Sequence, residues 1–188
     1  MAHNLRPFRQ YGENEVVNLF AYSGNAEDSS VVLTKGAVVK VQAPGFNPQI
    51  ASLSTPNAML GDVGASFANT VSERYGVSAK VSLASSGQSA LGLTLVDVRE
   101  LDENGEKLVF NPRKAAEMNV VISGQAVPVL TRGLVLYSGV NATAGHVASV
   151  GATAGELQST ATLPAGGVKV GTWLGTASSN VALLKIEL

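Results

Sequence analysis

The chain has 188 residues, enough for one large domain or two small ones, and its net charge of −1 leaves no basic field for binding nucleic acid. It has no cysteine, which excludes disulfides and thiolate metal sites, and no apolar run near the roughly 18 residues of a membrane helix. Only 14% of the residues are charged, against about 25% in typical domains, which favours surfaces that are buried in an assembly. The first residues hold no secretion signal, so we expect synthesis in a cytoplasm.

The first 15 residues are predicted to form an extended N-terminal arm, because Pro7 bars a helix around it. The arm carries four apolar or aromatic side chains, Leu5, Pro7, Phe8 and Tyr11. We predict that these side chains contact a neighbouring subunit. The alternative is that they fold back on their own domain.

A β domain is predicted over residues 16–188, beginning with a strand at residues 16–22. Residues 31–42 have the pattern of a hairpin that turns at Lys35-Gly36. Residues 77–83 alternate between apolar and polar side chains, as a half-buried strand does. Farther on, Asn104-Gly105 separates two β runs and favours a hairpin with a type I′ turn.

One short helix is predicted near residues 112–118, because Asn111 can cap it, Pro112 suits its first position and good helix formers follow. So short a helix must pack on a sheet, and Ala115 and Met118 are the side chains that we expect to do so. Pro128 predicts an edge position for its strand. Further strands are expected at residues 120–122, 127–130, 134–137, 146–150, 168–174 and 181–188.

A short internal repeat relates the two parts of the β domain. Residues 33–39, Leu-Thr-Lys-Gly-Ala-Val-Val, return at residues 130–136 as Leu-Thr-Arg-Gly-Leu-Val-Leu. The repeat predicts two related β halves, of about residues 16–110 and 119–188, although glycine-bounded β runs also resemble one another by chance. The many short strands with turn signals between them predict an all-β barrel or sandwich.

No pattern of catalytic or metal-ligating residues stands out. His3 and His146 have no His, Asp or Glu at ligand spacing, and Gly87-Gln88-Ser89-Ala90-Leu91 lacks the second glycine of a nucleophile elbow. The carboxylates between residues 97 and 106 suit an exposed hairpin tip better than a cation site. Trp173 is expected in the core. We therefore expect no enzymatic activity, no cofactor and no metal.

Four segments resemble those of tailed-phage capsid decoration proteins, also called cement proteins. They are residues 31–39, 90–95, 127–135 and 170–175, the last just before the C-terminal strand. The insert around residues 45–75 and the helix after Asn111 depart from the compact members of that family. The resemblance implies a β-rich structural protein on the outside of the virion that binds the major capsid protein, bridges its subunits, and assembles as a homo-oligomer, with a trimer favoured. In that setting the arm residues would contact either a subunit or the capsid.

Two other classes remain open. Another β-rich virion component, such as a tail-tube, head-completion or fibre-base protein, would share the low charge; a hexameric ring would separate a tube protein from a trimeric decoration protein. A carbohydrate-binding β domain would normally show paired exposed aromatic side chains, and the single tryptophan and four tyrosines here are scattered along the chain.

Overall fold

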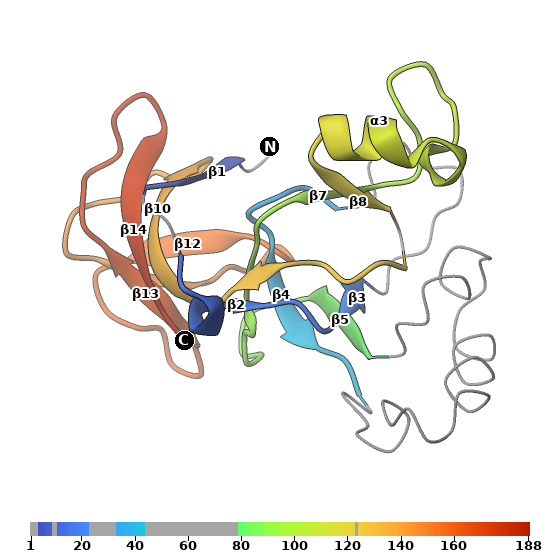
Figure 1. Cartoon of the computed structure of the whole chain (residues 1–188). Helices are drawn as coiled ribbons and strands as arrows, with labels where there is room; N and C mark the ends of the chain where they lie inside the picture. Colours follow the sequence, from blue (N-terminus) through green and yellow to red (C-terminus); the bar gives the residue numbers. More distant parts are fainter. Residues whose placement is uncertain (1–3, 9–10, 23–32, 44–78, 123) are drawn as a thin grey trace.

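The computed structural model describes residues 4–8, 11–22, 33–43, 79–122 and 124–188, and it is built mostly of β-strands (Figure 1). Two six-stranded sheets share a core, and a third sheet has two strands. The described residues contain one α-helix. The prediction of an all-β fold with one short helix is thus confirmed.

Sheet A is antiparallel throughout, and the C-terminal strand lies near its middle. Its strands, in spatial order, are β1 (Asn4–Pro7), β10 (Arg132–Ser138), β14 (Val181–Glu187), β13 (Lys169–Trp173), β11 (Val147–Val150) and β12 (Leu157–Thr160).

Sheet B curls so that its ends meet. Its strands, in spatial order, are β2 (Val16–Val17), β9 (Val129–Leu130), β6 (Gly92–Thr94), β4 (Val38–Val41), β5 (Lys80–Leu83) and β3 (Ala21–Tyr22). Ala21 in the last strand pairs with Ala126, just before β9, and the Val127 N–H donates to the Phe20 carbonyl at 2.9 Å. Sheet B therefore has the character of a small barrel, against which sheet A packs as the second layer of a sandwich.

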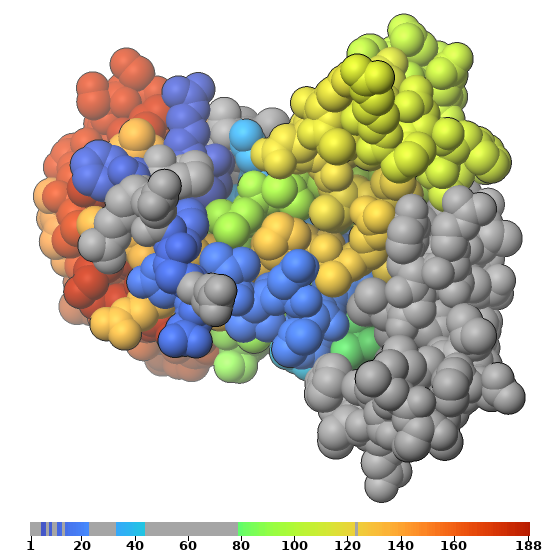
Figure 2. All heavy atoms as spheres, viewed as in Figure 1, coloured from blue at the N-terminus to red at the C-terminus, as the bar shows by residue number. Residues whose placement is uncertain are grey.

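A small lobe projects from sheet B, at the upper right of Figure 2. It holds the parallel pair β7 (Asp97–Arg99) and β8 (Val120–Ile122), the 3-10 turn η2 (Leu108–Phe110) and the helix α3 (Pro112–Glu117). The Asn111 side chain caps α3 by accepting the Lys114 N–H, and Pro112 opens the helix, as predicted. Ala115 is buried against Leu108 and Ile122, with Met118 beside them, so the expected packing is confirmed.

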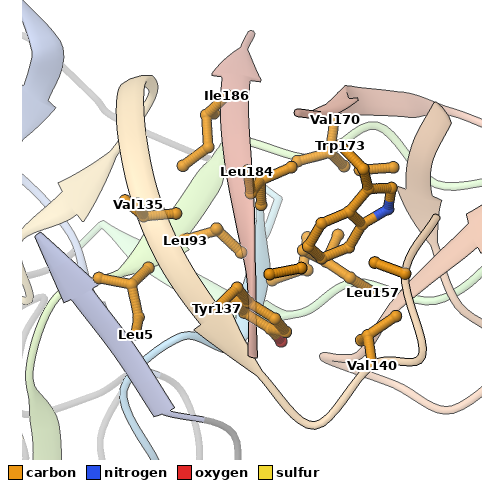
Figure 3. Close-up of a cluster of buried hydrophobic side chains, with 14 of the residues drawn as sticks. Leu5, Leu93, Val135, Tyr137, Val140, Leu157, Val170, Trp173, Leu184 and Ile186 are labelled. Carbon is orange, nitrogen blue, oxygen red and sulfur yellow. The ribbon is translucent and has the colours of Figure 1, made fainter. Parts of the chain in front are cut away.

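The alternation of side chains in sheet B produces two separate cores. Val38, Leu93 and Leu130 face sheet A, whereas Val39 and Val129, each next to one of them, face the opposite side. The first core also takes the inner residues of sheet A, and Trp173 and Tyr137 lie at its centre with ring centroids 6.0 Å apart (Figure 3). The prediction that Trp173 is a core residue is confirmed, since it is fully buried.

Tyr137 of sheet A also makes a hydrogen bond to the turn before β4 of sheet B. Its hydroxyl donates to the Gly36 carbonyl at 3.1 Å, in the turn that leads into β4 of sheet B. The phenol is buried, and burial raises the pKa of Tyr137 because the charged form is poorly solvated there. A neutral hydroxyl in this place can serve only as a hydrogen-bonding group.

Two strand glycines allow neighbouring strands to approach closely. A Cβ at Gly92 would lie 2.3 Å from the Leu130 carbonyl oxygen, and one at Gly171 would lie 2.0 Å from the Lys185 carbonyl oxygen. Gly92 lies in the segment 90–95 and Gly171 in the segment 170–175, two of the four segments on which the family resemblance rests. Any side chain there would push β6 from β9, or β13 from β14.

The chain crosses from sheet B to sheet A at Thr131, between β9 and β10. Sheet B therefore uses strands from residues 16–130, and sheet A uses residues 132–187 together with β1. The first copy of the repeat leads into β4 of sheet B, whereas the second copy spans the end of β9 and the start of β10.

Several local predictions need correction. Lys35 and Gly36 do form a turn, but Leu33 before it pairs with Val98, and β4 after it pairs with β5 and β6. The predicted hairpin is therefore wrong, because the two runs bind different neighbours. The predicted strand at residues 16–22 is divided into β2 and β3, which pair with β9 and β5.

The turn at residues 102–106 is tight, as predicted, but it is not type I′. The Gly105 N–H donates to the Asp102 carbonyl at 3.2 Å and the Asp102 N–H to the Glu106 carbonyl at 2.9 Å, and only Gly105 has a positive φ, +83°. This is a type I turn with a glycine bulge. After it comes η2 instead of a strand.

The edge position inferred from Pro128 is also wrong. Its strand, β9, lies between β2 and β6. Pro128 immediately precedes the strand, and its carbonyl accepts the Leu95 N–H at 3.0 Å. Pro128 has no N–H to donate, but it lies just before the paired residues of β9, so no hydrogen bond between strands is lost.

Candidate interaction surface

The N-terminal segment lies on the protein's own sheet. β1 pairs with β10 as an edge strand, and Leu5 is only 2% exposed in the core beneath it. The Tyr11 ring packs against the same core, and its hydroxyl donates to the Leu134 carbonyl at 3.3 Å. Leu5 and Tyr11 therefore fold back on their own domain, which was the alternative to contact with a neighbour.

The other two arm residues differ from these. Pro7 lies in β1 opposite Val135. Phe8 follows the strand, is held by an N–H bond to the Leu134 carbonyl at 3.2 Å, and leaves 58% of its surface exposed. Of the four apolar or aromatic arm residues, Leu5, Phe8 and Tyr11 have described side chains, and among these three Phe8 is the exposed one, open to the contact expected from the sequence.

The residues considered for chemistry do not form a metal-ligating group within the described ranges. His146 is partly buried, with its Nδ1 3.3 Å from the Ser159 hydroxyl, whereas His3 lies outside the described residues. Ser89 is exposed in the loop before β6. Within the described ranges, no three His, Asp or Glu side chains gather where a metal ion could bind.

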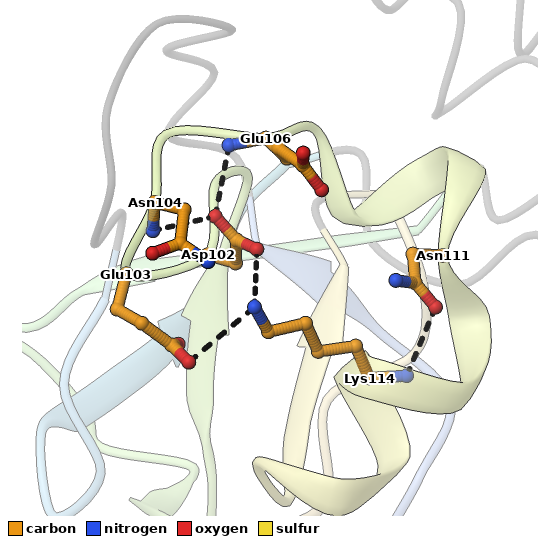
Figure 4. Close-up of polar contacts among 6 residues, drawn as sticks. All are labelled: Asp102, Glu103, Asn104, Glu106, Asn111 and Lys114. Atoms are coloured by element: carbon orange, nitrogen blue, oxygen red, sulfur yellow. Dashed lines mark hydrogen bonds and ion pairs between the residues drawn. The ribbon is translucent and has the colours of Figure 1, made fainter.

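The acidic hairpin binds the helix beside it (Figure 4). The Asp102 carboxylate is buried, accepts the N–H groups of Asn104 and Glu106 at 2.8 Å each, and pairs with the Lys114 ammonium at 2.5 Å. The Lys114 hydrogen bond, followed by that of the Glu106 N–H, holds the pKa of Asp102 below its ordinary value. Glu103 adds a second pair to Lys114 at 3.3 Å. These carboxylates therefore stabilise the lobe.

The outward side of sheet A is a candidate for binding. Alternate residues of β10 and β14 point into the core, and their neighbours point away from it. Here we call the second set, with Arg6 of β1 and Leu174 after β13, the outer face. Its central residues are Arg132, Leu134, Leu136, Val181, Leu183 and Lys185.

Two shallow hollows mark this face. One, of about 110 Å³, is lined by Arg6, Leu136, Ser138 and Val181. The other, of about 300 Å³, is lined by β10 and β14 with Leu174 at one side, and Arg132 and Lys185 also border it. Leu174 and Val181 remain 47% and 38% exposed. Each hollow therefore combines apolar walls with a cationic side chain.

The charge of sheet A differs from that of the chain. Its strands carry four basic residues and one acidic residue, a formal charge of +3, against −1 for the whole sequence. Lys169 and Lys185 both pair with the acid, Glu187, at 3.1 and 2.5 Å, and these two ammonium groups lower its pKa. Within the described part of the chain, Arg6 and Arg132 form no ion pair.

Known family models, curated proteins and solved structures were compared with the chain, and none matches it. Of the helices in the described ranges, none has the length and apolar character needed to cross a membrane.

Proposed function

We propose that the chain is a structural protein of a tailed-phage virion, which binds the outside of the capsid and stabilises it by bridging subunits. The observation that carries the proposal is the outer face of sheet A, where partly exposed leucines and Val181 lie on strands whose inner residues are fixed in the core. Because the backbone of the sheet is already ordered, little conformational entropy is lost when such a face binds a partner, and this favours binding.

The partner in this proposal is the major capsid protein. A stable interface of standard size covers about 800 Å² on each partner and has an apolar centre with a polar rim. The outer face has this arrangement, with leucines in the middle and Arg6, Arg132 and Lys185 around them. The protein acts by binding alone, without a catalytic step or a cofactor, because a ligand of the assembled shell stabilises that shell by mass action.

The protein is proposed to act as a homotrimer, so that one molecule can touch several capsid subunits. Three chains of 19.3 kDa give a particle of about 58 kDa, which light scattering after size exclusion resolves from a monomer or hexamer. A hexamer would instead favour a ring-forming tail component.

The decisive experiment compares phage particles made with and without this gene. We expect density for the protein on the exterior of the head in cryo-electron microscopy, and a lower temperature of DNA release from particles that lack it. Identical heads from both sources, or density confined to the tail, would refute a capsid decoration role.

A further inference from the structure

The outer face has an ordered pattern of side chains, set by the register of three strands. Leu136 stands opposite Leu183 on β14 and opposite Arg6 on β1. Leu134 stands opposite Lys185, which on its other side faces Thr172. Cross-strand neighbours on one face are in contact distance, so the leucines form a central strip with a cation on either side.

The two arginines differ from the lysines in their pairing. Lys169 and Lys185 are satisfied by Glu187, whereas Arg6 and Arg132 have no ion pair in the part of the chain that the structure describes. Each of these arginines is exposed and borders one of the two hollows. Arg132 stands opposite Glu187, whose carboxylate pairs with the two lysines, whereas Arg6 stands opposite Leu136. A planar guanidinium binds a carboxylate through two parallel hydrogen bonds, so each arginine can bind an acidic side chain of a partner.

We propose that the outer face of sheet A is the surface that docks on the capsid, and that its partner is an apolar patch of the major capsid protein bordered by carboxylates. This inference rests on the function proposed above and adds the docking face and the chemistry of its partner. Apolar side chains of the partner fill the two hollows, and its carboxylates pair with Arg6 and Arg132. The leucine strip supplies most of the affinity, and the arginines fix orientation and partner choice.

A second copy of this chain is the competing occupant, and charge disfavours it. Two outer faces brought together would each carry a formal charge of +3 in their strands, and Glu187 of each is already paired twice. Like charges facing each other across an interface oppose association. The same excess of positive charge attracts a surface rich in aspartate and glutamate.

The first test measures binding of the purified protein to undecorated shells of the major capsid protein. We expect Arg6→Gln with Arg132→Gln to weaken binding at least about tenfold. The matched control is Arg113→Gln, which removes an exposed arginine from α3 in the projecting lobe. A second matched pair tests the apolar part: Leu174→Ser should weaken binding, whereas Leu163→Ser, at a similar exposure of 43% against 47%, should not. Unfolding curves of all variants check that each is folded.

The second test identifies the occupant by zero-length cross-linking of amines to carboxylates on decorated shells. Arg6→Lys and Arg132→Lys variants place an amine at each of the two hollows, whereas Lys185 is already paired with Glu187 and would cross-link within its own chain. We expect cross-links from both positions to aspartates or glutamates of the major capsid protein. Cross-links only to another copy of this chain would show that the face is a subunit interface and would overturn the proposal.

The remaining outcomes separate the two proposals. If the wild-type protein does not bind shells, the function proposed above fails and this inference fails with it. If the wild type binds and the double arginine variant and Leu174→Ser bind equally well, the protein decorates the shell through another face, and only this inference is refuted.

Discussion

Leu5→Ala should destabilise the protein substantially, because Leu5 belongs to the core. Its side chain is 2% exposed and lies beside Tyr137 and Val135, beneath the edge strand β1 (Figure 3). Replacing a buried leucine by alanine costs about 2–5 kcal/mol, and the lower part of that range suits an edge strand that can shift toward the cavity. We therefore expect a loss of about 2–3 kcal/mol in the free energy of unfolding, or roughly 5–10 °C in Tm.

Urea denaturation followed by tryptophan fluorescence is a suitable assay, since the only tryptophan, Trp173, is fully buried in the same core. Phe8→Ala is the matched control, because Phe8 is three residues away and 58% exposed, and its loss should change stability by no more than about 0.5 kcal/mol. If Leu5→Ala proves as mild as Phe8→Ala, β1 does not contribute to the core in solution. Leu5 would then be free to contact a neighbour.

Three further predictions concern the interior and the lobe. Tyr137→Phe should cost about 1–2 kcal/mol in chemical denaturation, because the buried Gly36 carbonyl loses its donor, and an unchanged midpoint would contradict the link between the sheets. Gly171→Ala should give little folded protein in thermal melts, since its Cβ would meet the Lys185 carbonyl oxygen at 2.0 Å, whereas Gly12→Ala, with its nearest atom 3.7 Å away, should behave as wild type. Because the pKa of Asp102 is lowered, its ion pair stabilises the fold at pH values above 3.8, the ordinary pKa of aspartate. This contribution is lost as the pH falls below that value. The free energy of unfolding of Lys114→Met should therefore fall less than that of the wild type between pH 5 and pH 2. An equal fall in both proteins would refute a stabilising role for the Asp102–Lys114 ion pair.

Features determined by neighbouring residues could be predicted from the sequence. The helix after Asn111 has its cap, its Pro112 and its packing residue Ala115 within five positions, so its signals do not depend on the rest of the fold. The alternation that ends at Leu83 likewise places Ala79 and Val81 in a core. The turn at Gly105 could be located but not typed, because the Asp102 carboxylate, which accepts two N–H groups of the turn, favours a different geometry.

Pairing partners could not be predicted in this way. Leu33, before Lys35-Gly36, pairs with Val98, and β4, after it, pairs with β5 and β6. The local sequence of these two segments gives no indication of their partners. An alternating pattern shows which side chains share a face, but register and neighbour are decided where strands from distant parts of the chain meet. For the same reason the sequence showed Leu5 as an apolar residue in an arm, and only the pairing of β1 with β10 made it part of the core.

The sequence by itself determined the all-β class, the helix and the shortage of charge, because composition and local periodicity are enough for these. The tertiary structure alone decided which side of sheet A faces outward and which residues meet there. Arg6 and Leu136 are 130 positions apart, and they become neighbours only because β1 adds to the edge of a sheet built from the end of the chain. A binding face on a sheet is assembled across strands, since hydrogen bonding between backbones, which carries no side-chain signal, sets its geometry.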